Sequence, residues 1–108
     1  MVANLIAMKI DLKPNEVVVK AGDSLFMNGK DVKGKLIVTN QRIYFEAVQA
    51  EDKDYNQEIH PSVIHEVLPF NSYLFLANGL TIVKKNGENL RFKVKDRSSW
   101  ELLINRMY

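Results

Sequence analysis

The hydrophobic and polar positions of the chain alternate most clearly on either side of one short polar segment. Leu36 and Val38 precede this segment, and Ile43 and Phe45 follow it, with a single residue between the members of each pair. A spacing of two residues places each pair on one face of an extended strand. The segment between the pairs, residues 39–42, contains an asparagine, which tolerates turn conformations. The pattern therefore predicts a β-hairpin with one buried face.

Further strands are predicted by short apolar runs that are β-branched or alternate with polar residues. Turn signals separate these runs, and Asn-Gly pairs are among the strongest hairpin signals in a sequence. The predicted strands cover residues 16–20, 24–27, 63–70, 73–76, 80–83 and 90–95, and turns are predicted at residues 21–23, 28–29, 77–80 and 85–88.

The first fourteen residues allow two interpretations. Ile6, Met8, Ile10 and Leu12 are spaced as one face of a strand, and the same stretch also fits a short helix. Pro14 follows, and the residue before a proline is disfavoured in the helical conformation. Residues 1–14 are therefore expected to form an N-terminal extension or an extra strand.

The last twelve residues, 97–108, have helical rather than strand periodicity. Asp96 or Ser98 can cap the start of a helix, and Ser98 with Glu101 has the spacing of a capping box. One face of this helix is apolar, which indicates that it packs on the sheet. The apolar stripe consists of Trp100, Leu103, Ile104 and Met107.

These elements predict a mainly β fold with one domain over residues 1–108. About seven antiparallel strands form an open barrel, and the C-terminal helix at 97–108 caps it, because a lone amphipathic helix must bury its apolar face. The predicted core is Leu36, Val38, Ile43, Phe45, Ile82, Leu90, Phe92, Val94, Trp100 and Leu103.

The composition narrows the range of functions. The chain has 108 residues, a net charge of +2 and no cysteine, which excludes disulfides, thiolate catalysis and cysteine-ligated zinc. No run approaches the roughly 18 apolar residues that a membrane-spanning helix needs. Met1 to Met8 lacks the basic start and the apolar length of a signal peptide. We therefore expect a soluble, cytoplasmic protein that can attach peripherally to a membrane.

Local charge points to one candidate binding surface. The alternation of residues 90–95 places Arg91, Lys93 and Lys95 on one face of a strand, about 7 Å apart in sequence order. Such a row can contact phosphates or anionic lipid headgroups, each cation contributing about 1 kcal/mol near an acidic membrane. A solvated outer face with edge lysines is the alternative interpretation. With the preceding turn, the candidate ligand-binding residues are Lys84, Lys85, Arg91, Lys93 and Lys95.

A second charged segment, residues 46–58, carries five carboxylates against one lysine and is expected to be a solvated loop. His60 and His65 lie near acidic residues, but their odd spacing places them on opposite faces of a strand, so no metal site is expected.

Tyr44, Tyr73 and Phe75 could form a platform for stacking bases. Arginines are not interleaved with them, however, and the net charge is small, so packing in the core or at its rim is favoured and no nucleic-acid partner is expected. The sequence has no nucleophile elbow, no glycine-rich phosphate loop and no marked carboxylate pair. We therefore expect no catalytic residues, no cofactor and no enzymatic activity.

The central hairpin resembles a known family. Lys33-Gly34-Lys35-Leu36, followed by Thr39-Asn40-Gln41-Arg42-Ile43-Tyr44-Phe45, is similar to the core motif of GRAM domains, which have the pleckstrin-homology-like superfold. Glu16 matches the acidic residue that often opens the first strand of that family. The resemblance spans residues 15–107 and is closest to small stand-alone bacterial members.

The resemblance implies a binding module without catalysis, which contacts membrane lipids or proteins. The basic signature with which pleckstrin-homology domains bind inositol phosphates is incomplete here, because no arginine closes the series Lys20, Lys30, Lys33 and Lys35. We therefore predict a peripheral adaptor for a protein partner or an anionic lipid surface. The alternative is a structural protein that forms homo-oligomers through a barrel edge or the helix.

Overall fold

The computed structural model describes residues 11–72 and 76–108, so most of the predicted N-terminal extension lies outside the described residues. The described chain forms seven strands, two short 3-10 helices and a C-terminal α-helix. The elements are β1 Val18–Met27, β2 Asp31–Thr39, β3 Ile43–Ala47, η1 Ala50–Tyr55, β4 Gln57–Ile59, η2 Pro61–Val63, β5 Ile64–Ser72, β6 Leu76–Lys84, β7 Asn89–Val94 and α2 Arg97–Asn105.

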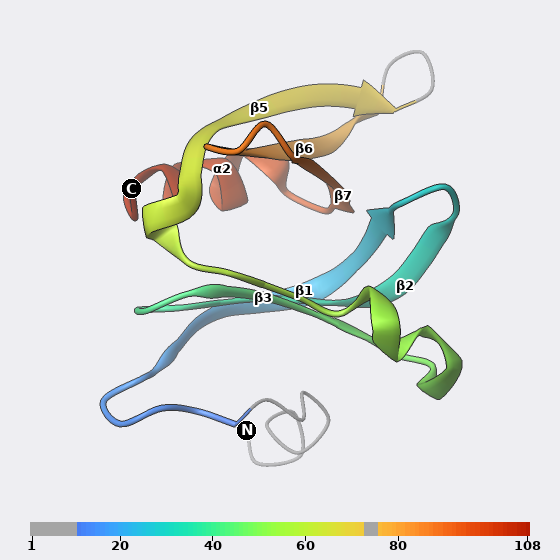
Figure 1. Cartoon of the computed structure of the whole chain (residues 1–108). Helices are drawn as coiled ribbons and strands as arrows, with labels where there is room; N and C mark the ends of the chain where they lie inside the picture. The colour runs from blue at the N-terminus through green and yellow to red at the C-terminus, as the bar shows by residue number, and fades with distance from the viewer. Residues whose placement is uncertain (1–10, 73–75) are drawn as a thin grey trace.

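The seven strands form one antiparallel sheet in the order β4-β3-β2-β1-β7-β6-β5. The sheet curls into a half-barrel, with β5, β6 and β7 folded over β1, β2 and β3 (Figure 1). Helix α2 packs against β5 and β6. This arrangement confirms the predicted fold class of a seven-stranded open barrel with a C-terminal helix.

Strand β1 joins the two halves of the sheet. It pairs with β2 along its length, whereas only Ser24 to Met27 pair with β7, opposite Arg91 to Val94. We call this short pairing the β1–β7 seam. The side of the sheet that carries the core side chains is the inner face, and the opposite side is the outer face.

Three phenylalanine rings form the centre of the core. Phe26, Phe45 and Phe92 come from β1, β3 and β7, and their ring centroids lie 5.1 to 5.7 Å apart. Aromatic pairs at such separations add to the stabilisation from burial alone. All of the predicted core residues are buried except Leu103, which is partly buried against the same cluster.

The predicted turn at residues 21–23 is wrong, because β1 runs through it without interruption. Gly22 lies against Trp100 of α2, and a β-carbon at this position would be 3.2 Å from Cζ2 of the indole. The glycine therefore lets the helix approach the strand closely. It does not reverse the chain.

The predicted hairpin at residues 77–80 is also wrong, because these residues lie inside β6. Gly79 pairs with Phe70 on β5, and the ring of Phe70 covers the space that a side chain would need. An aromatic ring that packs over a strand glycine in this way replaces the missing side-chain contacts. The predicted strand 73–76 lies largely outside the described residues.

The other two Asn-Gly turns are confirmed. Gly29 and Gly87 have φ angles of 81° and 92°, values that favour glycine, and nothing crowds either position. The first connects β1 to β2, and the second connects β6 to β7.

The acidic segment at residues 46–58 is more ordered than the predicted solvated loop. Glu46 belongs to β3 and is buried beside Lys53, with 3.2 Å between Oε2 and Nζ. Asp52 in η1 is buried and bonds to Lys30 at 3.0 Å. These two ion pairs fix η1 against the β1–β2 turn and β3.

Strand β5 begins one residue later than predicted, because Pro61 to Val63 form η2. An irregularity in its pairing with β6 between Ile64 and Glu66 interrupts the expected alternation, so Ile64 and Val67 are both buried.

Helix α2 begins at Arg97, directly after Asp96, which is one of the two predicted cap residues, and it ends at Asn105 instead of continuing to residue 108. Asp96 occupies the position before the helix with a φ of 57°, and its side chain makes no capping hydrogen bond. Ser98 lies inside the helix, so the predicted capping box with Glu101 is wrong. The apolar stripe is confirmed, with Trp100 and Ile104 buried and Leu103 and Met107 partly buried.

Replacing Gly34 by alanine is expected to destabilise the fold. A β-carbon there would clash with the carbonyl oxygen of Glu46 and with the ring of Phe45. Overpacking of this kind costs about 1–3 kcal/mol. Urea denaturation monitored by tryptophan fluorescence measures the loss. Lys33→Ala, at the exposed neighbouring position, is the control and should change the stability by less than about 0.5 kcal/mol. Equal stabilities of Gly34→Ala and the parent chain would show that the strand relaxes around the new methyl group.

Candidate functional site

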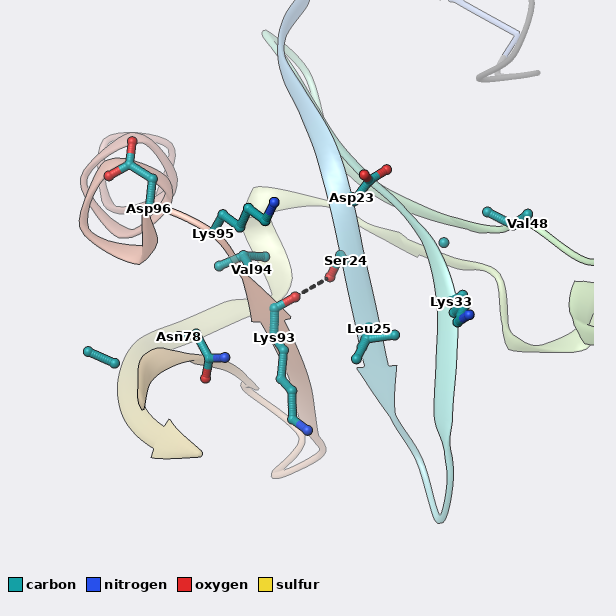
Figure 2. A pocket seen from close by; sticks show the side chains of 12 residues that line it. Asp23, Ser24, Leu25, Lys33, Val48, Asn78, Lys93, Val94, Lys95 and Asp96 are labelled. Carbon is teal, nitrogen blue, oxygen red and sulfur yellow. Dashed lines mark hydrogen bonds between the residues drawn. The ribbon is translucent and has the colours of Figure 1, made fainter. Parts of the chain in front are cut away.

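A groove of about 600 Å³ crosses the outer side of the sheet at the β1–β7 seam (Figure 2). Its volume lies within the range of small-ligand sites. The groove is lined by residues of β1, β2, β6 and β7 and of the segments that follow β3 and β7. The lining residues are Asp23, Ser24, Leu25, Lys33, Gly34, Val48, Ala77, Asn78, Lys93, Val94, Lys95 and Asp96.

The register of the sheet explains which side chains face the groove. Leu25 on β1 is paired with Lys33 on β2 and with Lys93 on β7, so these three residues form one row across three strands. Directly paired residues project to the same face. The row lies on the outer face because Phe26, the neighbour of Leu25, points into the core.

The groove forms where β1 and β7 separate. Their last paired residues are Ser24 and Val94, and the Ser24 hydroxyl donates a hydrogen bond to the Lys93 carbonyl at 2.9 Å. The residues of β1 that precede Ser24 pair with β2 only, whereas the chain after Val94 turns at Asp96 into α2. Because the pairing ends here, β1 and the segment after β7 diverge, and the groove lies where they separate.

Ion pairs cancel part of the charge around the groove. Asp23 bonds to Lys35 at 2.8 Å, and this hydrogen bond, with a smaller contribution from Lys95, holds the pKa of Asp23 below its ordinary value. Lys93 pairs with Asp31 at 3.0 Å. Within residues 11–72 and 76–108, Lys33 and Lys95 form no ion pair. These two exposed lysines leave the groove with positive charge on both sides.

The candidate residues from the sequence are only partly brought together. Lys93 and Lys95 line the groove. Lys84 pairs with Glu88 at 3.0 Å beside the β6–β7 turn, and Lys85 is exposed at that turn. Arg91 is on the outer face as expected, but its guanidinium stacks over Phe70 at 4.1 Å from the ring centroid.

The groove residues from the first half of the chain were not predicted as site residues. Lys33 and Leu25 approach Lys93 only because β1 pairs with β7, which no local pattern specifies. Lys33 belongs to the series of lysines around the first hairpin, and its place beside Gly34 in that series was the only signal in the sequence.

A buried polar network lies away from the groove, at the turn between β2 and β3. Arg42 donates to both carboxylate oxygens of Glu16, at 2.8 and 3.1 Å, and to Glu58 at 2.9 Å. The Thr39 hydroxyl donates to Glu16 at 2.6 Å. Arg42 is the principal cause that lowers the pKa of Glu16 to about 2. The network attaches the segment before β1 to the central hairpin.

The side chains of the same turn hold that segment as well. Asn40 accepts a hydrogen bond from the backbone of Val17 at 2.8 Å and donates one to the carbonyl of Asn15 at 3.0 Å. Gln41 donates to the carbonyl of Pro14 at 3.0 Å. The polar residues of the motif that resembles GRAM domains therefore have structural roles here.

The histidines are not gathered into a ligand set. His60 lies 3.2 Å from Glu58, and His65 is exposed on β5. No group of three potential metal ligands occurs in the described part of the chain. Tyr44 is half-buried, whereas Tyr73 and Phe75 lie outside the described residues. Among the described helices, none is long and apolar enough to cross a bilayer.

The free edge of β5 is partly occupied by side chains from the C-terminal segment. The backbone N–H of Val67 donates to the Tyr108 hydroxyl at 3.0 Å, and Arg97 donates to the carbonyl of Phe70 at 2.8 Å. Pro69, between these positions, has no N–H to offer a neighbouring strand. This edge is therefore poorly suited to pairing with another chain.

Comparison with solved structures identifies the fold. The crystal structure of the C-terminal domain of an unknown protein from Leishmania infantum matches with a TM-score of 0.73 and 12% identity over 87% of this chain and 86% of that one. The N-terminal PH domain of Vps36 matches with a TM-score of 0.71 and 14% identity over 94% of this chain and 85% of that one. No protein-family profile and no curated protein matches the sequence. These likenesses establish a pleckstrin-homology-like fold.

Proposed function

We propose that this chain is a non-enzymatic binding module that acts as a peripheral adaptor and meets its partner at the outer-face groove. The observation that carries the proposal is the position of Lys33 and Lys95, two exposed lysines without an ion pair in the described structure, at a groove of about 600 Å³. Positive charge on both sides of a concave site favours an anionic ligand, such as a protein segment or a lipid headgroup.

The fold supports this proposal, because pleckstrin-homology-like folds are typically binding domains, and one solved neighbour is a PH domain. We further propose that the chain is a GRAM-like member of this fold. Glu16 and Arg42, which match the family pattern, form a buried ion pair that joins the segment before β1 to the central hairpin.

Self-assembly through a barrel edge is the less favoured function. The β5 edge is occupied by Arg97 and Tyr108, and β4, the strand at the other end of the sheet, has only three residues. Short or covered edges oppose edge-to-edge association. We also propose that the adaptor is cytoplasmic, where anionic lipids line the inner membrane surface.

Co-sedimentation with lipid vesicles tests the membrane form of this proposal. Phosphatidylcholine vesicles with and without about 30% phosphatidylserine should be compared at low and at about 0.15 M salt, because exposed charges are screened as salt rises. If lipid is the ligand, only the anionic vesicles sediment the protein, and added salt weakens the binding.

A charge-reversal variant connects any such binding to the groove. Lys33→Glu/Lys95→Glu should abolish sedimentation, whereas Lys85→Glu/Arg106→Glu, with the same change in net charge at exposed positions outside the groove, should retain it. Equal losses in both variants would show that net charge alone drives binding and would contradict a groove site.

A further inference from the structure

The shape and charge distribution of the groove distinguish between two kinds of anionic ligand, a phosphate group and an extended acidic peptide. Lys33 and Lys93 lie on opposite sides of Leu25, so their backbones are two strand spacings apart, about 10 Å. Lys95 lies two residues beyond Lys93, about 7 Å along the chain. Lys33 and Lys95 are the groove lysines that form no ion pair with a described residue. On ideal sheet spacing, extended one residue past the last β1–β7 pair, their backbones are about 12 Å apart on the diagonal.

This separation is poorly suited to a single phosphate group. Cations that bind one phosphate converge on its oxygens, whereas Lys33 and Lys95 approach the groove from opposite sides. Asp23 and Asp96 also line the groove, and their carboxylates would repel a multiply charged headgroup. The carboxylate of Asp23 can also accept a hydrogen bond from a backbone N–H group, which an extended peptide supplies and a phosphate does not.

The separation does suit an extended chain with two acidic residues. In an extended segment, side chains four residues apart project from the same face about 13 Å from each other. The residue midway between them would lie over β1, between Leu25 and Asp23. Leu25 is half-buried, and Val48 is exposed at one end of the groove, so the groove also offers apolar surface.

We infer that the ligand of the groove is an extended acidic peptide segment of a protein partner, with Asp or Glu at two positions four residues apart and an apolar residue midway between them. This inference rests on the proposed function and specifies its partner. Lys33 and Lys95 bind the two carboxylates, Leu25 contacts the apolar side chain, and Asp23 accepts a hydrogen bond from a backbone N–H group.

Selection from a displayed library of random heptapeptides on the immobilised full chain tests the inference. We expect the enriched peptides to have acidic residues four positions apart with an apolar residue at the midpoint. A fluorescein-labelled synthetic copy should bind in fluorescence anisotropy, and its affinity should fall at least about tenfold with Lys33→Glu/Lys95→Glu, since close charge pairs contribute to binding. The variant Lys85→Glu/Arg106→Glu should bind as the parent chain does.

Circular dichroism and thermal melting of both double variants establish that each is folded before binding is compared. Replacing both acidic residues of the peptide by lysine should abolish its binding to the parent chain and restore binding to Lys33→Glu/Lys95→Glu. Recovery of affinity on this double exchange requires direct pairing between groove and peptide, because a merely structural effect of the variant would not be reversed.

Two outcomes would overturn the inference. The first is that no peptide is enriched, and the second is that the enriched peptides bind the two double variants equally well. If anionic vesicles bind and the groove variant abolishes that binding while no peptide is enriched, the ligand is a lipid surface and the adaptor proposal stands without the peptide. If neither vesicles nor peptides bind, the adaptor proposal falls as well.

Discussion

Replacing Trp100 by alanine should lower the free energy of unfolding by about 3–5 kcal/mol, the usual loss for a large aromatic residue removed from a core. The indole is 3% exposed, packs against Gly22 and lies under the Lys20 ammonium, which is 5.0 Å from the ring centroid. It is thus the contact through which α2 reaches β1. A loss of this size is comparable with the whole stability of a marginal domain.

Urea denaturation followed by far-ultraviolet circular dichroism measures this loss without depending on the tryptophan signal. Leu102→Ala is the matched control, because Leu102 lies on the same helix but is 57% exposed. Its substitution should change the stability by less than about 0.5 kcal/mol. A loss of less than about 1 kcal/mol for Trp100→Ala would mean that the helix does not close the half-barrel.

Replacing Arg42 by methionine should destabilise the protein by about 3–5 kcal/mol, because it leaves a buried carboxylate without its counter-charge. The side chain of Glu16 has no exposed surface, and that of Arg42 is 7% exposed. Methionine keeps most of the length and the apolar stem of arginine, so the lost charge dominates the effect. Chemical denaturation at neutral pH measures the change.

The variant Arg42→Met/Glu16→Gln is the control for this prediction. A neutral amide no longer needs the guanidinium, so the double variant should be more stable than Arg42→Met alone, as expected for directly coupled residues. If the two substitutions destabilise additively, the ion pair contributes nothing and the loss comes from packing.

The pH dependence of stability provides a second check on the same pair. Arg42 is the main cause that lowers the pKa of Glu16 from 4.5 to about 2. A carboxyl group whose folded pKa is depressed stabilises the protein fully above its unfolded pKa, and this contribution is lost as the pH falls through the folded value. The stability difference between the parent chain and Arg42→Met should therefore shrink between about pH 4.5 and pH 2.

Much of the fold could be predicted from the sequence because strand alternation and the helical stripe are local signals. Glycine was harder to interpret. Three Asn-Gly pairs are indistinguishable by local sequence, yet only Gly29 and Gly87 have turn conformations, whereas Gly79 lies inside β6 under the ring of Phe70. Gly22 similarly makes room for Trp100. What separates a turn glycine from a packing glycine is a side chain on another strand or on the helix.

The candidate site was predictable only in part for a related reason. The outward direction of Lys93 and Lys95 follows from alternation along one strand. Their approach to Lys33 depends on the β1–β7 seam, which pairs two strands that are distant in the sequence. Whether a lysine is in an ion pair also depends on residues distant in the sequence, because Lys93 pairs with Asp31 of β2. The sequence pattern therefore predicted that Lys93 and Lys95 lie on the outer face, but it did not predict that a groove forms between them and Lys33.

The position of the groove on the β1–β7 seam also has a consequence for folding. The hairpins of β1–β2, β2–β3 and β6–β7 join neighbours in sequence, whereas Ser24 bonds to Lys93 across a separation of 69 residues. Pairings of such long range are slow to form, because the intervening loop must close first. The groove is completed only when this late pairing is made. A ligand that binds there selects the finished sheet and should slow the separation of its two halves.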